Sequence, residues 1–268
     1  MPATLCFAQL SDLHVAARPL QGVVGSLAMA RTAIDAVLRA EARLAACVLT
    51  GDLVDAGTAE SYALLAELLA PLEARMPVLL MPGNHDARAP LREVFADHRY
   101  LPATGKLNYR VELGALAYVA IDSLVDGSGH GAIDAATLAW LDATLAAEPS
   151  RPTVLALHHP PFATGIGFMD AIGLRDGAAE LAAIVARHPQ IVRVLCGHVH
   201  RAITTSWAGR IAMTAPSTCQ QIPFDPAPDS PEAFVLEPPG WLLHRWDGAA
   251  LQSAVMPVER SAGPINYA

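Results

Sequence analysis

The most telling shortage in this chain is of positive charge. Only one of its 18 basic residues is a lysine, Lys106, and 26 acidic residues outnumber them, so the formal net charge is −8. Nucleic-acid binders normally carry a basic patch; none is visible here, and we expect no nucleic-acid polymer as a partner. An uncharged apolar run of membrane-spanning length is also missing from the sequence, so we expect neither a transmembrane helix nor a membrane partner.

Cysteine is scarce as well, and closely spaced cysteine pairs are absent. The four cysteines are Cys6, Cys47, Cys196 and Cys219, and no two have the C-x-x-C spacing of a zinc or redox site. The first three lie inside strand-like apolar runs, where a free thiol packs as a small apolar side chain. The chain begins almost directly with such a run and shows no basic leader, so a reducing, cytoplasmic location is expected.

Apolar runs and amphipathic segments alternate along the first 100 residues, which is typical of layered α/β proteins. Strands are predicted at 4–10, 46–50, 77–81, 108–113, 116–122, 153–157, in the run that ends at 196, and at 201–207, 210–214, 240–246 and 251–257. Helices are predicted at about 23–42, 58–74, 88–96, 134–146 and 177–187, with Asp134 as a cap. After residue 216 the chain becomes rich in proline and acidic residues, as in a surface loop or lid.

Five short polar blocks each follow an apolar run of the kind that forms a buried strand. They are Ser-Asp-Leu-His at 11–14, Gly-Asp-Leu-Val-Asp at 51–55, Gly-Asn-His-Asp at 83–86, His-His-Pro at 158–160 and Gly-His-Val-His at 197–200. Strand ends that meet at one edge of a sheet bring distant residues into one site. Alternate residues point the same way, so Asp-x-His and His-x-His each direct two side chains to one side. Three Asp or Asn oxygens and four His nitrogens suit two metal ions that share a carboxylate.

This order of blocks resembles the calcineurin-like metallophosphoesterase superfamily, whose pattern is D-x-H, G-D-x-x-D, G-N-H-[DE], H and G-H-x-H. The resemblance runs from Asp12 to His200. It implies an α/β fold with four layers (α+β), in which a two-sheet β-sandwich is flanked by helices and the metal site lies at the strand ends. It also implies that residues 1–215 form the dinuclear-metal catalytic domain. Residues 216–268 are expected to complete that domain as a lid and hairpin and to supply an oligomer contact.

The resemblance also implies which side chains bind metal. It assigns Asp12, His14, Asp52 and His200 to a first metal ion, and Asp52, Asn84, His158 and His198 to a second. Asp52 then bridges two ions, and such mixed carboxylate, amide and imidazole ligands suit Fe, Mn, Zn or Co rather than Ca. In the family the ligand is usually the histidine two residues before a proline, which selects His158 over His159. His159 is then expected beside the site or packed against the helices, and it becomes the ligand if that rule fails.

The histidine after the asparagine faces the substrate phosphate in that family, so His85 is expected to be catalytic together with Asp52 and Asn84. His85 would stabilise phosphoryl charge or protonate the leaving alkoxide, with its ring oriented by Asp86. Asp55 is expected to act as a cap or a hydrogen-bond acceptor near the site. Two cations lower the pKa of a water molecule, and the resulting hydroxide attacks phosphorus in line with the leaving oxygen.

The C-terminal part narrows the expected substrate. The segment APSTCQQIPFDP at 215–226 and LHRW at 243–246 resemble the bacterial class III cyclic-nucleotide phosphodiesterases and their glycerophosphodiesterase relatives. We therefore predict a metal-dependent phosphodiester hydrolase that acts on 3′,5′-cAMP or related small phosphodiesters. A glycerophosphodiesterase and a broad-specificity phosphomonoesterase remain alternatives, and a non-catalytic scaffold is the alternative of a different class. Relatives in this subgroup often form dimers or larger assemblies, so a homo-oligomer is expected.

Overall fold

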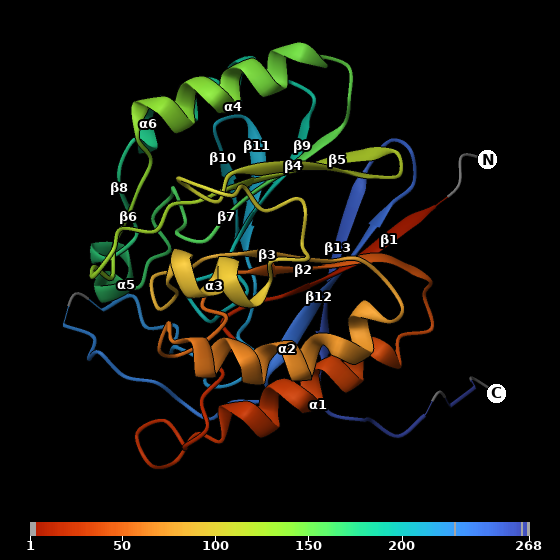
Figure 1. Ribbon diagram of the computed structural model, residues 1–268, viewed down its shortest axis with the longest axis vertical. Helices are drawn as coiled ribbons and strands as arrows, with labels where there is room; N and C mark the ends of the chain where they lie inside the picture. The colour runs from red at the N-terminus through yellow and green to blue at the C-terminus, as the bar shows by residue number, and fades with distance from the viewer. Residues whose placement is uncertain (1–3, 228, 264, 267–268) are drawn as a thin grey trace.

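The first of two central sheets carries the N-terminal βα units. The computed structural model describes residues 4–227, 229–263 and 265–266 of the chain (Figure 1). The strand order in this sheet is β13 (Leu251–Pro257), β12 (Gly240–Trp246), β1 (Leu5–Leu10), β2 (Leu44–Thr50) and β3 (Val78–Met81). Strands β1, β2 and β3 run parallel, because helices α1 (Ser26–Leu38) and α2 (Ala59–Glu73) return the chain between them. Strand β12 pairs antiparallel with β1, so the C-terminal hairpin extends the same sheet.

The second sheet is also largely parallel. Its order is β10 (Thr204–Trp207), β11 (Arg210–Thr214), β9 (Ile191–Cys196), β7 (Thr153–Leu157), β5 (Leu116–Ile121) and β4 (Tyr109–Leu113). Antiparallel hairpins close it at both edges. Helices α4 (Ala135–Ala147) and α6 (Ala178–Arg187) lie on its outer side (Figure 1). Asp134 caps α4 as predicted, since its carboxylate accepts a hydrogen bond of 2.7 Å from Thr137 N.

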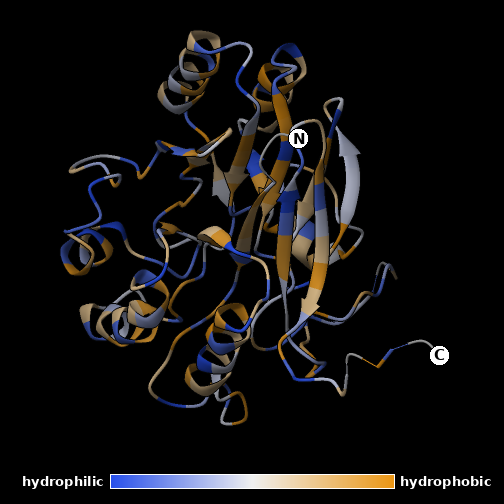
Figure 2. Ribbon diagram, turned by 90° about the vertical axis from the view of Figure 1, so that its right-hand side faces the viewer, coloured by the Kyte–Doolittle hydropathy of each residue, from blue (hydrophilic) through white to orange (hydrophobic). Residues whose placement is uncertain are grey.

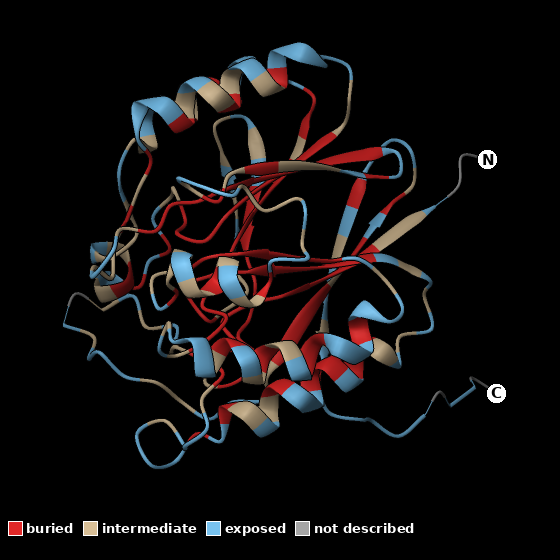
Figure 3. Cartoon of the chain, viewed as in Figure 1, coloured by how far each residue is buried: buried red, intermediate tan, exposed pale blue. Residues whose placement is uncertain are grey.

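Alternate residues of the central strands enter two different apolar cores. Phe7 and Val48 pack between the two sheets, in a core that continues to α4 and α6. Their neighbours Ala8 and Leu49 pack on the opposite face, against α1 and α2. Figure 3 shows this burial along the strands and on the inward sides of the helices, and Figure 2 shows apolar residues along the same strands. Both faces of the sheet are buried, which explains why these strands read as continuous apolar runs in the sequence.

The predicted four-layer α/β sandwich is confirmed, and so are the predicted long elements, with shifts of a few residues at their ends. The helix expected at about 23–42, for example, spans Ser26–Leu38, and the one expected at 88–96 is α3 (Arg88–Val94). The sequence missed three short elements: β6 (Gly131–Ala132), α5 (Gly167–Ala171) and β8 (Leu174–Asp176). None of them is long enough to produce a periodic pattern. Among the described residues no helix combines the length and apolar character required to cross a bilayer.

Candidate metal centre

The five polar blocks follow the carboxyl ends of five parallel strands and meet at one edge of the sandwich. Strands β1, β2 and β3 deliver the first three blocks from the first sheet, and β7 and β9 deliver the other two from the second. Among the described residues, seven other than glycine have a positive φ, and five of these are predicted ligands: Asp12, His14, Asp52, His198 and His200. Left-handed backbone is costly for such side chains and clusters at functional sites. The loops are therefore shaped to present these side chains at the cost of local backbone strain.

The predicted ligands of the first metal ion form one buried group. Donor atoms of Asp12, His14, Asp52 and His200 all lie within 4.8 Å of one another. His14 Nε2 is 3.6 Å from Asp52 Oδ2, and His200 Nε2 is 3.6 Å from Asp12 Oδ1. Two carboxylates and two imidazoles at these distances leave room for one shared cation among them.

Hydrogen bonds on the far side of the two rings fix their protonation. His200 Nδ1 lies 2.9 Å from Gln220 O, and His14 Nδ1 lies 3.3 Å from Asp55 Oδ1. A carbonyl or carboxylate oxygen only accepts, so both Nδ1 atoms carry the proton and both Nε2 atoms present lone pairs. These two Nε2 atoms are 3.1 Å apart. Burial lowers the pKa of both rings, for His200 to about 4, so they are neutral, and a cation is what relieves their facing lone pairs.

The predicted ligands of the second ion converge on the same carboxylate. His158 Nδ1 donates to Thr50 O at 2.8 Å, which directs His158 Nε2 towards Asn84 Oδ1 at 3.2 Å and Asp52 Oδ2 at 3.4 Å. His198 Nδ1 lies 3.0 Å from the same amide oxygen. Asp52 Oδ2 is therefore close to an imidazole of each group. Burial alone would favour the neutral forms of His158 and Asp52. The attraction between these two groups outweighs burial, so it raises the pKa of His158 to about 9 and holds the pKa of Asp52 well below its usual value.

An unpaired carboxylate oxygen supports the fit of metal ions to these residues. Asp12 is fully buried, and its Oδ1 accepts a hydrogen bond of 2.9 Å from His198 N. Its Oδ2 is buried and has no hydrogen-bond partner among the described residues. Burial, only partly offset by the charge of His158, raises the pKa of this carboxyl to about 6. A buried, unpaired carboxylate oxygen is costly unless a cation or proton binds it, so the donor set suits a metal centre.

The adjacent histidines point in different directions. His159 Nδ1 lies 2.8 Å from Ser123 Oγ, and a Cβ on Gly131 would collide with its ring. One nitrogen of His159 is within 4.8 Å of donor atoms of His158 and His198, but no carboxylate joins that trio. Only His158 faces both Asp52 and Asn84. This geometry favours His158 as the ligand, which stays a prediction.

His85 occupies the rim of the site with its side chain 39% exposed. Its backbone N–H donates to Asp52 Oδ1 at 2.9 Å, and its ring packs edge-on against His14 at 4.6 Å. Its Nδ1 donates to Asp55 O at 2.9 Å. Burial lowers the pKa of His85, but the charges of Asp52 and Asp55 outweigh it and raise the pKa above its usual value. Asp55 thus accepts hydrogen bonds near the site, as the sequence predicted: its carboxylate accepts from His14 and its backbone oxygen from His85.

The prediction that Asp86 orients the His85 ring is wrong. Asp86 is buried below the site, where its carboxylate accepts hydrogen bonds from Leu53 N, Gly83 N and the Tyr62 hydroxyl. It therefore joins the two loops that carry Asp52 and Asn84. The Asp86 side chain points inwards, whereas the ring of His85 turns outwards to the backbone oxygen of Asp55.

A cavity of about 260 Å³ opens above the metal site. Six of its lining residues are apolar, and we call them the apolar wall: Leu20, Val24, Met169, Ile172, Ile222 and Phe234. The polar lining residues that are not predicted ligands are Gln21, Asp55, His85 and Gln220, and none of the lining residues is lysine or arginine. Sequence reasoning missed this wall, because its members come from separate segments without a shared pattern.

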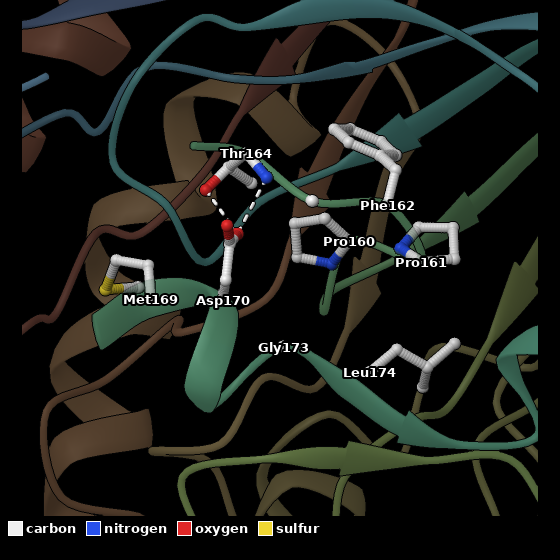
Figure 4. A pocket seen from close by; sticks show the side chains of 9 residues that line it. Pro160, Pro161, Phe162, Thr164, Met169, Asp170, Gly173 and Leu174 are labelled. Atoms are coloured by element: carbon white, nitrogen blue, oxygen red, sulfur yellow. Dashed lines mark hydrogen bonds between the residues drawn. The ribbon is translucent and has the colours of Figure 1, made fainter. Parts of the chain in front are cut away.

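A smaller hollow of about 200 Å³ lies between residues 160–164 and 169–174 and shares Met169 with the first (Figure 4). Asp170 points into it, but its carboxylate is already used. It accepts hydrogen bonds from Thr164 N at 2.7 Å and Thr164 Oγ1 at 2.6 Å, which close the loop before α5. The hollow is a structural feature beside the site, and its one carboxylate stabilises the loop.

The strand ends of this sandwich bring two groups of imidazoles around one carboxylate, a donor set that suits two metal ions with a shared ligand. Residues 6–202 match the family described as calcineurin-like phosphoesterases, and the chain belongs to this family.

Several similar proteins are named for phosphodiester hydrolysis. The chain is 34% identical to a probable glycerophosphodiester phosphodiesterase of Arcobacter nitrofigilis, over 74% of this chain and 72% of that protein. It is 32% identical to the 3′,5′-cyclic adenosine monophosphate phosphodiesterase of Escherichia coli K12, over 80% and 76% of the two chains. Among solved structures, a dimetal phosphatase from Danio rerio has a TM-score of 0.66 at 14% identity, over 95% of this chain and 96% of that one. That structural similarity supports the fold alone.

Proposed function

We propose that this protein is a phosphodiesterase that hydrolyses small phosphodiesters, with 3′,5′-cAMP as the expected substrate, at a centre of two metal ions. The observation that carries the proposal is the position of Asp52 Oδ2, which lies 3.6 Å from His14 Nε2 and 3.4 Å from His158 Nε2. One carboxylate is thereby shared between two donor groups. Asp12, His14, Asp52 and His200 would hold one ion, and Asp52, Asn84, His158 and His198 the other. The ligand chemistry suits Fe, Mn, Zn or Co.

When bound, the two ions supply Lewis acidity and a water of lowered pKa. The chain itself supplies orientation and a proton. Asp55 O accepts the proton of His85 Nδ1, and the neighbouring carboxylates raise the pKa of this ring, which favours a second proton on its Nε2. His85 at the rim of the cavity is then placed to donate that proton to the leaving alkoxide or to stabilise charge on the phosphoryl oxygens.

The cavity supports a diester with an apolar or planar group as the substrate. A phosphate monoester carries a second negative charge, and the lining residues include no lysine or arginine to pair with it. The apolar wall suits a nucleobase better than it suits glycerol, whose hydroxyls would lose hydrogen bonds with water there. Of the two activities named among the relatives, the wall favours the cyclic nucleotide.

A substrate panel tests this proposal. Protein reconstituted with Mn, Co, Zn or Fe is assayed for kcat/KM on cAMP, glycerophosphoethanolamine, bis-p-nitrophenyl phosphate and p-nitrophenyl phosphate. We expect both cAMP and the aryl diester to exceed the monoester, and cAMP to exceed the glycerol diester. A preference for the monoester would assign the chain to the phosphatase alternative, and a preference for the glycerol diester to the glycerophosphodiesterase alternative. A chain that binds no metal and hydrolyses none of them would be a scaffold.

We further propose that the protein is a cytoplasmic homo-oligomer. The edge strand β13 supports a contact between copies: it carries no charged residue, and Val255 on it is 57% exposed. Unprotected strand edges are surfaces on which another strand adds. Light scattering after size exclusion measures the mass; we expect a dimer or larger for the parent and a monomer for Val255→Lys. A monomeric parent would remove the oligomer from the proposal.

A further inference from the structure

A buried glutamine connects the two sheets directly behind the metal site. Gln9 lies in β1 with no exposed surface. Its Nε2 donates to Thr50 Oγ1 at 2.9 Å and to Cys196 O at 3.1 Å. Thr50 is the last residue of β2 in the first sheet, and Cys196 is the last residue of β9 in the second. One side-chain amide therefore joins the strand ends from which Asp52 and His198 extend.

The hydrogen-bond partners fix the orientation of this amide. Cys196 O is a carbonyl and only accepts, so the atom that faces it is the nitrogen of Gln9. Gln9 Oε1 then faces His244 Nε2 at 3.0 Å, and the imidazole must donate from that atom. His244 Nδ1 is left as an acceptor for the Ser253 hydroxyl at 2.8 Å. Burial and the charge of Arg193 lower the pKa of His244 to about 3, in agreement with a neutral ring.

The same chain of hydrogen bonds reaches a predicted ligand. Thr50 O accepts from His158 Nδ1 at 2.8 Å, and its hydroxyl bonds Ser11 Oγ at 2.8 Å, one residue before Asp12. A shift of Thr50 would thus move Asp52 along the chain and His158 through its hydrogen bond. A buried polar network that is fully paired locks one arrangement of the groups that it joins.

We infer that Gln9 is a positioning residue that sets the spacing between the metal ligands of the first sheet and those of the second. His244 and Ser253 fix the orientation of its amide. Gln9 is neither a predicted metal ligand nor a residue that lines the cavity above the site. The inference rests on the proposed dinuclear centre for its functional effect, whereas the hydrogen-bond pattern that carries it involves only residues of this chain.

Gln190 offers a matched control. It is also a buried glutamine, its Nε2 donates to Leu145 O at 2.9 Å, and it contacts His188 Nδ1 at 3.3 Å. It precedes β9, whereas Cys196 ends that strand, so about 20 Å of strand separates it from the metal end. Gln190→Leu removes a similar buried amide without touching the link between the sheets.

The experiment measures binding of Mn²⁺ by calorimetry and the Mn–Mn coupling by electron paramagnetic resonance in the full chain, with thermal unfolding alongside. Gln9→Leu is expected to weaken binding of the second Mn²⁺ by about 10- to 100-fold and to change the coupling, as losses of groups behind metal ligands do. It should lower kcat with little change in KM. Gln190→Leu is expected to lower the melting temperature comparably but to change Mn²⁺ affinity by less than about twofold. Equal metal affinity and coupling in the two variants would overturn the inference.

Two further measurements keep the outcome decisive. If Gln9→Leu does not fold, His244→Phe keeps the ring stacked on Phe7, from which it lies 4.6 Å, but releases the Gln9 amide. It must then weaken the second Mn²⁺ for the inference to stand. Nitrogen NMR of His244 in the parent should show a neutral ring protonated at Nε2 between pH 5 and 8, and the opposite tautomer would overturn the inference. A parent that binds two Mn²⁺ but hydrolyses no phosphodiester contradicts the proposed function alone, and one that binds fewer contradicts both.

Discussion

The two sheets contribute different chemistry to the metal centre. The loops after β1, β2 and β3 supply all the predicted oxygen ligands, Asp12, Asp52 and Asn84, with one imidazole from His14. The loops after β7 and β9 supply imidazoles only, from His158, His198 and His200. One side therefore collects negative charge and the other collects imidazole nitrogens. Neither side alone surrounds a cation, so the centre exists only when the two sheets have docked.

The largest expected effect comes from removing the carboxylate on which both sides depend. Asp52→Ala is expected to lose both metal ions and the phosphodiesterase activity together, because Asp52 Oδ2 is close to an imidazole of each group. Elemental analysis of the purified variant checks this. Asp142→Ala, which removes a carboxylate on α4 that pairs with Arg187, serves as the control with normal metal content. Two ions retained by Asp52→Ala would disprove the bridging role.

The nitrogen-donating side is tested by its two adjacent histidines. His158→Ala is expected to leave one metal ion per chain, because the second ion loses an imidazole that faces Asn84 and Asp52. His159→Ala removes a ring that bonds Ser123 and should keep metal content near the parent's. Elemental analysis and calorimetry distinguish the two. The reverse pattern would make His159 the ligand.

His85 tests whether a residue of the oxygen-supplying side acts on substrate without binding metal. General acid catalysis contributes about 10²–10⁴-fold, so His85→Ala should keep both ions and lower kcat by at least about 10-fold. The loss should be smaller for bis-p-nitrophenyl phosphate, whose leaving group needs no proton, than for cAMP. Equal losses on both substrates would indicate a purely electrostatic role. An unchanged kcat with metals intact would exclude His85 from catalysis.

The smallest expected effect comes from replacing Tyr62, which lies beneath the loops that supply the oxygen ligands. The Tyr62 hydroxyl donates to Asp86 Oδ1 at 2.8 Å and accepts from Ala87 N at 2.8 Å. Tyr62→Phe leaves these buried partners unpaired and should lower the free energy of unfolding by about 1–3 kcal/mol. Urea titration measures this loss, and metal content should be unchanged. Lost metal with unchanged stability would show that Tyr62 acts on the centre rather than on the fold.

The position of the site was predictable because it depends on repeated short patterns. Each block follows an apolar run, and parallel strands bring their carboxyl ends to one edge, so the assembly of Asp12, Asp52 and His198 follows from sequence. The link made by Gln9 was not predicted, although a glutamine inside the apolar run CFAQL was a visible signal. Its partners are 41 and 187 residues away, and no local pattern encodes contacts of that range.

The prediction of how His85 is oriented was wrong for a related reason. Sequence reasoning chose the adjacent carboxylate, Asp86, as its partner. The structure instead gives that ring the backbone oxygen of Asp55, 30 residues earlier. Whether His85 or Asp86 faces the solvent depends on how the loops after β2 and β3 lie against each other. The Asp86 carboxylate fixes that arrangement by accepting backbone hydrogen bonds from both loops, and these bonds can be seen only in the folded structure.

The left-handed backbone at five predicted ligands also bears on how this protein can change over generations. Each such residue costs the fold on the order of 1–3 kcal/mol, and glycine at the same position would carry little of that cost. Drift towards glycine at these positions would therefore relieve backbone strain in the empty protein while removing its donors. Selection for folding alone would not preserve this centre, so a descendant freed from its catalytic task has a less strained backbone within reach as it loses its metal.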